Sequence, residues 1–172
     1  MIKGIALVQG RLAKLLSELN DFEKRIFLEQ LDAEWPDMIQ SGIELAYVLG
    51  QLNEEQSTLV LNILKDRLIF LIKTARDLWC ILEEVSYQQN QIILLAIGFR
   101  LPKLIRTVNG LKNILKELNE EQCVFVLTKL ADRLPTLIKS KKLLINMASY
   151  LNENQLNVVL TFLNNDKTSK SI

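Results

Sequence analysis

The sequence predicts an all-α protein in which about five two-helix repeats, and so about ten helices, stack in a single row. Three observations lead to this prediction. One short motif recurs every 33 residues without an insertion, a second motif keeps the same period, and the apolar residues between them follow helical spacing. Only three prolines and six glycines interrupt the 172 residues, too few for a β protein with many tight turns.

The first motif marks the start of one helix in each repeat, which we call the first-type helix. Its five copies begin at Leu19, Leu52, Val85, Leu118 and Leu151. In each copy an Asn or Ser stands three residues before a Glu or Gln, which is the pattern of a capping box. Acidic residues such as Glu54 and Glu120 follow in the first turn, where the helix dipole favours negative charge. Five helices are therefore expected to begin at these boxes.

A second-type helix follows in each repeat, and the sequence offers two starting points for it. Proline suits the first helical position and breaks an interior one, so the column Pro36, Pro102 and Pro135 predicts a helix from Pro135 to about Ser149. Ile69 is the exception in this column. The alternative places the turn a few residues later, with a serine or threonine as the cap: Ser41, Thr74, Thr107 and Ser140.

The row opens with a second-type helix and closes with a first-type helix from Glu153 to about Asn164. We expect one helical-repeat domain over residues 1–164 and a polar, frayed tail over residues 165–172. Each hairpin buries its apolar face only against its neighbours, which is the organisation of a right-handed-type α-solenoid. The last helix has no following hairpin to cover its apolar flank, so this flank is a candidate contact surface.

Composition argues against catalysis. Histidine is absent, which removes the commonest general base and the commonest metal ligand, and neither Cys80 nor Cys123 has a histidine to activate it. We expect no enzyme, no catalytic residue, no cofactor and no metal site. The longest apolar run, Ile92 to Phe99, is far shorter than the roughly 20 residues that span a bilayer. We therefore expect no membrane association and a cytoplasmic location, or a host cytosol if the protein is a translocated effector.

The paired helices at a 33-residue period resemble the α-solenoid superfamily, which includes tetratricopeptide and HEAT repeats, over nearly the whole chain. The tryptophan, glycine and tyrosine pattern of tetratricopeptide repeats is missing. The opening Leu118-Asn-Glu-Glu-Gln122 is similar to the Leu-Thr-Pro-Glu-Gln opening of TAL-effector repeats, without their Gly-Gly pair. The segment Leu134-Pro-Thr-Leu-Ile-Lys-Ser140 resembles mitochondrial transcription-terminator repeats, without their mid-repeat glycine. The shared architecture implies a binding protein that uses its helix faces.

Two sets of residues near the second-type helices are the candidate binding residues. A cation column recurs once per hairpin at Lys73, Arg106 and Lys139. Varied polar and aromatic residues occupy the helices themselves: Tyr47, Arg76, Asn109, Asn113, Lys142, Asn146 and Tyr150. Because one helix series of a solenoid commonly lines the concave surface, varied residues there suit selective binding. The same cation column would be expected equally well if these residues only formed a solvent-exposed helix face that prevents aggregation of the stack.

From these features we predict a protein–protein interaction scaffold that acts as an adaptor, a chaperone or an inhibitor of its partner. By analogy it could be a bacterial effector or an effector regulator. The alternative is a nucleic-acid-binding helical-repeat protein in which Lys73, Arg106 and Lys139 meet phosphates. The formal net charge of +1 and the lack of interleaved aromatic residues favour the protein partner. Homo-oligomerisation through the terminal helices is compatible with both.

Overall fold

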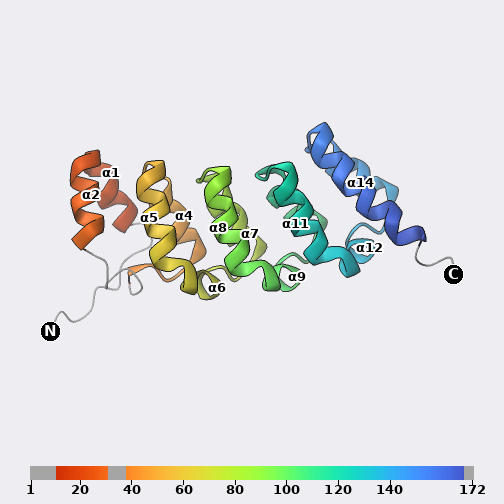
Figure 1. The fold of residues 1–172 in the computed structure, drawn as a ribbon, viewed down its shortest axis with the longest axis horizontal. Coiled ribbons are helices and arrows are strands. Elements are labelled where there is room, and N and C mark those ends of the chain that lie inside the picture. Colours follow the sequence, from red (N-terminus) through yellow and green to blue (C-terminus); the bar gives the residue numbers. More distant parts are fainter. Residues whose placement is uncertain (1–10, 31–37, 169–172) are drawn as a thin grey trace.

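The computed structural model describes residues 11–30 and 38–168, with side chains as far as residue 163. Ten helices of eight residues or longer lie in these ranges, and they alternate between two layers (Figure 1). The first-type layer contains α2 (Asp21–Gln30), α5 (Glu54–Leu64), α8 (Tyr87–Ile97), α11 (Glu120–Leu130) and α14 (Glu153–Thr168). The second-type layer contains α1 (Arg11–Glu18), α4 (Gly42–Leu49), α7 (Ala75–Glu83), α10 (Val108–Lys116) and α13 (Lys141–Ala148).

Each helix packs mainly on the helix of the same layer in the next repeat. In the second-type layer α1 contacts α4, α4 contacts α7, α7 contacts α10 and α10 contacts α13. The first-type layer repeats this order from α2 to α14. The two layers run side by side along the row in Figure 1, with α1 and α2 at one end of the row and α14 at the other. The predicted all-α stack of about ten helices is confirmed.

The structure decides between the two predicted starts of the second-type helices. These helices begin after the serine and threonine column, because Ser41, Thr74, Thr107 and Ser140 are extended N-caps whose hydroxyl oxygens accept backbone N–H groups. For example, Thr74 Oγ1 accepts the Asp77 N–H at 3.1 Å. The prediction of one helix from Pro135 to about Ser149 is therefore wrong, because Ser140 caps a new helix in the middle of that range.

A separate short helix begins at the proline column. In each of the three central repeats a 3₁₀ turn follows the first-type helix, and a four-residue helix follows the turn. These short helices are α6 (Leu68–Leu71), α9 (Leu101–Leu104) and α12 (Leu134–Leu137). Pro102 and Pro135 stand in the first turn of α9 and α12, where a missing N–H costs no helical hydrogen bond. Pro36 lies outside the described residues.

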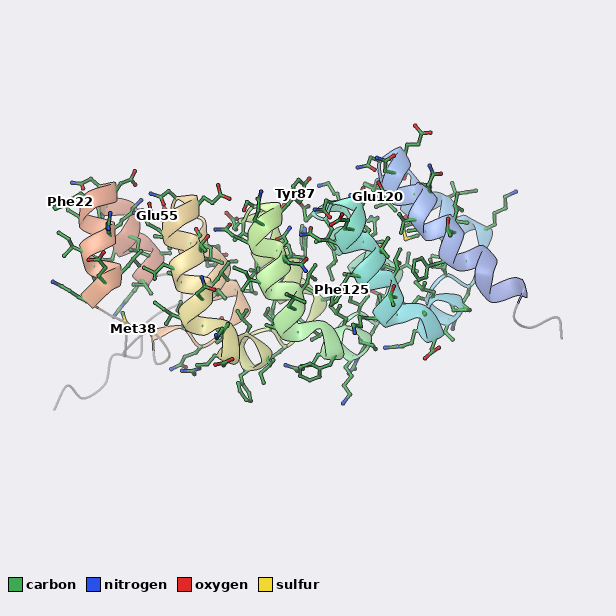
Figure 2. All side chains as sticks on the ribbon, viewed as in Figure 1. Phe22, Met38, Glu55, Tyr87, Glu120 and Phe125 are labelled. Atoms are coloured by element: carbon green, nitrogen blue, oxygen red, sulfur yellow. The ribbon has the colours of Figure 1, made fainter. Side chains whose placement is uncertain are left out.

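The capping boxes lie where the sequence predicts them. Asn53 Oδ1 accepts the Gln56 N–H at 3.0 Å, and Gln56 Oε1 accepts the Asn53 N–H at 3.2 Å. The same reciprocal pair forms between Asn119 and Gln122 and between Asn152 and Gln155. Figure 2 shows Glu55, Tyr87 and Glu120, which follow three of the caps, along one long edge of the row. The local sequence thus fixes the start of each first-type helix.

The glutamine of each internal box also joins its repeat to the preceding one. The Nε2 amides of Gln56, Gln89 and Gln122 donate to backbone carbonyls in the first turn of the previous first-type helix, at 3.0, 2.8 and 2.5 Å. All these glutamines are buried. The first copy carries Glu23, which has no amide donor, and no first-type helix precedes it in the described residues. Gln155 departs from the series and donates to the carbonyls of Leu115 and Leu118.

The arginines of the 3₁₀ turns form a second cross-repeat link. Arg100 Nη1 donates to the Ile72 carbonyl at 3.3 Å, and Arg133 Nη1 donates to the Pro102 carbonyl. Both acceptors belong to the preceding repeat, and both arginines are half-buried. The arginines that follow α8 and α11 therefore also hold these helices against the preceding repeat.

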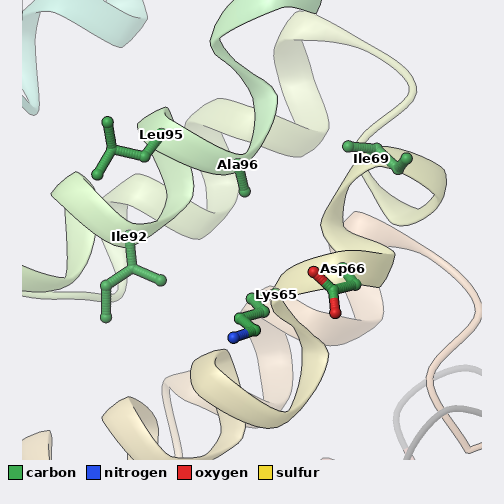
Figure 3. A pocket seen from close by; sticks show the side chains of 6 residues that line it. All are labelled: Lys65, Asp66, Ile69, Ile92, Leu95 and Ala96. Carbon is green, nitrogen blue, oxygen red and sulfur yellow. The ribbon is translucent and has the colours of Figure 1, made fainter.

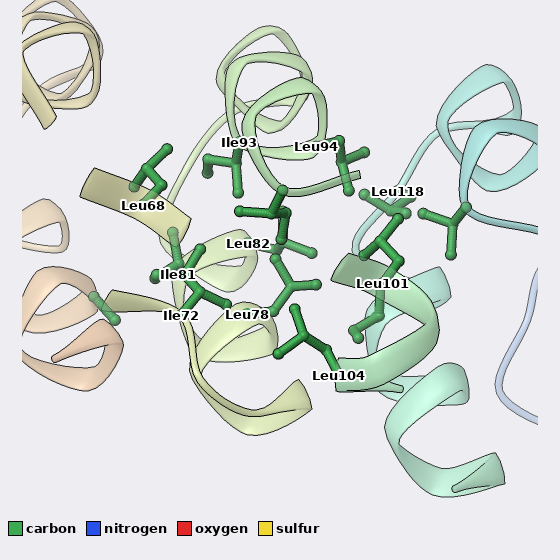
Figure 4. Packing of buried hydrophobic residues seen from close by; sticks show 14 of the residues in the cluster. Leu68, Ile72, Leu78, Ile81, Leu82, Ile93, Leu94, Leu101, Leu104 and Leu118 are labelled. Atoms are coloured by element: carbon green, nitrogen blue, oxygen red, sulfur yellow. The ribbon is translucent and has the colours of Figure 1, made fainter. Parts of the chain in front are cut away.

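The core runs continuously between the layers. Figure 4 shows Leu68, Leu78, Leu94 and Leu101, which come from α6, α7, α8 and α9 and pack together as buried side chains. In the second-type layer the helices approach at small residues. A Cβ atom on Gly42 would lie 2.6 Å from the Asp77 Cβ, which is too close for any L side chain. The glycine at position 42 therefore allows α7 to pack closely against the start of α4.

The last first-type helix is longer than the sequence indicates. α14 continues to Thr168, four residues beyond the predicted end, so part of the expected tail is helical. The remaining residues 169–172 lie outside the described residues. No helix in the described ranges has both the length and the apolar character needed to cross a bilayer.

Candidate functional site

The ten sequence-predicted binding residues lie along the second-type layer and on its connecting links. Lys73, Arg106 and Lys139 are exposed in the links that precede α7, α10 and α13, so the cation column is a real surface feature. Arg106 Nε donates to the Lys103 carbonyl at 2.8 Å, which orients this guanidinium along its own repeat. The other exposed members are Tyr47, Arg76, Asn109, Lys142, Asn146 and Tyr150, whereas Asn113 is half-buried.

Some of these residues are brought together and others are not. Tyr47 on α4 and Arg76 on α7 line a small pocket of about 180 Å³ between these helices, together with Cys80, Glu83 and Glu84. Burial, and then the charge of Glu83, raises the pKa of the Glu84 carboxyl. Tyr150 lies under the ammonium group of Lys112, 3.8 Å from the ring centroid. The predicted set is therefore spread over several contacts along the layer.

A larger hollow lies on the opposite, first-type layer, and no prediction from the sequence pointed to it. It is a groove of about 520 Å³ between α8 on one side and, on the other, α6 and the 3₁₀ turn that follows α5. Ile92, Leu95 and Ala96 form its α8 wall, and Figure 3 shows them opposite Lys65, Asp66 and Ile69. The floor and walls are mainly aliphatic, while Lys65 and Asp66 place one charge of each sign on the rim. We call this hollow the α5–α8 groove.

The α5–α8 groove exists because of a size difference between successive repeats. Ile92 lies on the groove wall, and the residue 33 positions later is Phe125. A Cβ atom on Gly98 would lie 2.9 Å from Phe125 Cζ, so the phenyl ring fills the corresponding space between α8 and α11. Figure 2 shows Phe125 on the side of α11 that faces α8. The smaller Ile92 leaves the same space open one repeat earlier.

Large apolar side chains are exposed close to the groove in the sequence. Leu95 on its wall is 63% exposed, Phe99 in the turn after α8 is 71% exposed, and Phe70 in α6 is 65% exposed. Single exposed apolar residues are common on soluble proteins, but several beside a hollow mark a contact surface. From the sequence, the run from Ile92 to Phe99 was considered only as a possible membrane span. The sequence did contain a signal for this surface, because apolar residues stand here at repeat positions that are polar in other copies. Phe99, for example, takes the position that Asp66 holds one repeat earlier.

The described residues contain no group of three or more His, Cys, Asp or Glu side chains that could hold a metal ion. Cys123 is buried, and burial, with a smaller effect from Glu120, raises the pKa of its thiol to about 12. A thiol with this pKa is protonated at neutral pH and is a poor nucleophile. Its Sγ lies 3.6 Å from the Leu115 carbonyl oxygen, which is consistent with a packing role.

Comparisons of the chain with protein-family models, with curated proteins and with solved structures found no match. The function must therefore be inferred from the surfaces of the stack itself.

Proposed function

We propose that this protein is a protein–protein interaction scaffold, and that the α5–α8 groove receives apolar anchor side chains of its partner. The observation that carries the proposal is the aliphatic groove of about 520 Å³ with the 63% exposed Leu95 on its wall. Protein interfaces derive most of their energy from a few apolar or aromatic anchors in such hollows, surrounded by a polar rim. Lys65 and Asp66 provide that rim.

The scaffold itself is suited to this role. The glutamine and arginine links hold successive hairpins in register, so the two groove walls, on α8 and on the 3₁₀ turn with α6, are fixed before a partner binds. A preformed site avoids the entropic cost of ordering its own walls. An adaptor, a chaperone and an inhibitor all use the same step, which is occlusion of an apolar segment of another protein. A bacterial effector or effector regulator remains within this proposal by analogy.

Nucleic acid is the second candidate partner, because all three members of the cation column are exposed, namely Lys73, Arg106 and Lys139. Such a column would meet phosphates in succession and would give binding that weakens steeply with salt. The near-neutral formal charge of +1 favours the protein partner.

The test is capture of partners from lysate with the purified full chain and three variants, each with and without nuclease. Leu95→Lys places a charge in the α5–α8 groove. Leu59→Lys is the matched control, because Leu59 is also exposed on a first-type helix but does not line the groove. The third variant reverses the cation column at Lys73, Arg106 and Lys139 to Glu.

The expected result is a discrete protein that resists nuclease, is retained by Leu59→Lys and is lost by Leu95→Lys. Nucleic acid that is lost only by the triple variant would replace the proposal with the second candidate. Equal capture by all four proteins would remove both surfaces from consideration.

A further inference from the structure

Charge is unevenly distributed between the two long edges of the row. At one edge the first-type helices of the three central repeats end, and α6, α9 and α12 lie along it (Figure 1). We call it the basic edge and define it as residues 65–73, 98–106 and 131–139. It carries eight cations and two acids. The opposite edge, where the same helices begin, carries seven acids and one cation in residues 50–56, 83–89 and 116–122. A net charge near zero for the whole chain is therefore compatible with two edges of opposite charge.

Many of the cations on the basic edge are accessible. Lys73, Lys103, Arg106 and Lys139 are exposed, and none of them forms an ion pair within the described residues. The half-buried arginines that follow α8 and α11 are different, because they form the cross-repeat bonds described above. The four exposed side chains are thus available to an anionic partner.

Two phenylalanines stand among these cations. The short helix α6 buries Leu68 and Leu71 but leaves Phe70 exposed, and the turn after α8 leaves Phe99 exposed. The two rings come from consecutive repeats, in which α6 contacts α8. Neither ring lines the α5–α8 groove or the pocket between α4 and α7. The basic edge thus combines exposed phenyl rings with exposed cations outside both hollows.

The surface of an anionic lipid bilayer suits both kinds of side chain. Each Lys or Arg near such a surface strengthens binding about fivefold, and a phenyl ring gains free energy when it leaves water for the boundary between headgroups and acyl chains. Because α6, α9 and α12 lie along the same edge, they can touch one plane together (Figure 1).

The acidic edge does not oppose this contact strongly. The first-type helices α5, α8 and α11 are each 11 residues long and separate the two edges. At a rise of about 1.5 Å per residue this is a separation of roughly 16 Å, about twice the Debye length of about 8 Å at physiological salt. Repulsion between the acidic edge and an anionic surface is therefore largely screened when the basic edge is in contact.

We propose that the basic edge binds the surface of an anionic lipid bilayer, with Phe70 and Phe99 at the level of the headgroups and the exposed cations on anionic headgroups. This proposal replaces the sequence-based expectation of no membrane association, because binding at a bilayer surface needs no spanning segment. Single-stranded nucleic acid fits less well, since a strand that stacks on aromatic rings is held in a basic groove, and both rings lie outside the two hollows. The inference goes beyond the proposed function and does not depend on the α5–α8 groove.

Co-sedimentation of the purified full chain with lipid vesicles tests the proposal. The vesicles contain phosphatidylcholine alone, or phosphatidylcholine with about 30% phosphatidylserine as the anionic lipid. Phe70→Ser, Phe99→Ser and Lys103→Glu each change the basic edge. Tyr87→Ser and Lys116→Glu are the matched controls, because these exposed side chains belong to the opposite edge. All five positions are exposed, and circular dichroism checks that each variant keeps the fold.

We expect the natural chain to bind the anionic vesicles, to bind them less tightly as salt rises, and to leave phosphatidylcholine vesicles unbound. Each substitution on the basic edge should weaken binding by about fivefold or more, and each control by less than about twofold. Absence of binding, equal binding to neutral vesicles, or equal losses in the controls would overturn the proposal.

Two further measurements test the other occupants. Binding of a fluorescent single-stranded oligonucleotide that is lost in Phe99→Ser, without binding to vesicles, would assign the basic edge to nucleic acid. Self-association in sedimentation without vesicles, lost both in Lys103→Glu and in Glu120→Lys on the opposite edge, would show that two copies cover each other's edges. Either result would overturn the membrane proposal. Capture of a protein through Leu95 would be unaffected, so failure here is distinct from failure of the proposed function.

Discussion

The glutamine links between repeats give the sharpest test of how this stack is held together. Replacing Gln122 by Glu keeps the capping box, because a carboxylate oxygen can still accept the Asn119 N–H. It removes the Nε2 donor that bonds the Tyr87 carbonyl at 2.5 Å. It also places a carboxylate within hydrogen-bonding distance of that carbonyl in a site that is 3% exposed. The substitution therefore isolates the cross-repeat bond from the helix cap.

The expected cost follows from these contacts. A lost hydrogen bond removes about 1 kcal/mol, and an unpaired buried acceptor costs about 1–3 kcal/mol. The Tyr87 carbonyl is in the first turn of α8 and keeps its helical partner, so the second cost falls on the buried oxygen of the new carboxylate that has no donor. We expect a total loss of about 2–3 kcal/mol at pH 7. For a chain of this length that corresponds to a fall of roughly 4–10 °C in the unfolding midpoint.

The pH dependence distinguishes this mechanism from a simple packing defect. Burial beside a carbonyl raises the pKa of the new carboxyl in the folded state above its unfolded value of about 4.3. Below that value the group is protonated in both states and can donate to the carbonyl, so the deficit shrinks. The deficit grows as pH rises from the unfolded pKa through the folded pKa.

Urea unfolding at pH 4 and pH 7, each relative to the natural chain, measures both effects. The matched control is Glu23→Gln, at the repeat position of Gln122 in the first copy. No first-type helix precedes this copy in the described residues, so no cross-repeat bond can be gained there. We expect this control to change the free energy of unfolding by less than about 0.5 kcal/mol. A loss below about 0.5 kcal/mol for Gln122→Glu, or an equal loss at the two pH values, would refute the reasoning.

Three further predictions test the packing and the site. Gly42→Ala should destabilise the fold by about 1–3 kcal/mol in urea titration, because its Cβ would lie 2.6 Å from the Asp77 Cβ. At pH 8 a thiol reagent should label Cys80 in the folded protein and reach Cys123 only after denaturation, since burial raises the pKa of Cys123 to about 12; equal labelling rates would contradict this. Glu84→Gln should stabilise the fold slightly at pH 7 and not at pH 3, because the raised pKa of Glu84 penalises only its charged form.

The fold was largely accessible from the sequence because its information is local and repeated. The capping boxes at Asn53 and Asn119 identify helix starts within a few residues, and the 33-residue period aligns them. The proline column misled the placement of the second-type helices, since a proline in a first turn looks the same whether the helix runs for four residues or for fifteen. The serine and threonine caps carried the correct signal.

The groove was not accessible because it depends on the fit between neighbouring repeats. Ile92 and Phe125 are both apolar residues at one repeat position, and only the structure shows that Phe125 reaches Gly98 whereas Ile92 lines an open groove. The glutamine links had a visible signal, namely Gln at every internal box and Glu23 at the first. That these glutamine amides bond to the previous first-type helix could be seen only in the structure.

The dual bonding of the linking glutamines has a consequence for how the chain unfolds. Each amide side chain caps the start of its own helix and bonds to the start of the preceding first-type helix, so opening one hairpin removes a capping contact and an interfacial contact together. Local melting is therefore coupled to separation from the neighbour, and the middle of the row should open as a single cooperative unit. Amide protons of the internal first-type helices α5, α8 and α11 should therefore exchange with solvent together rather than helix by helix.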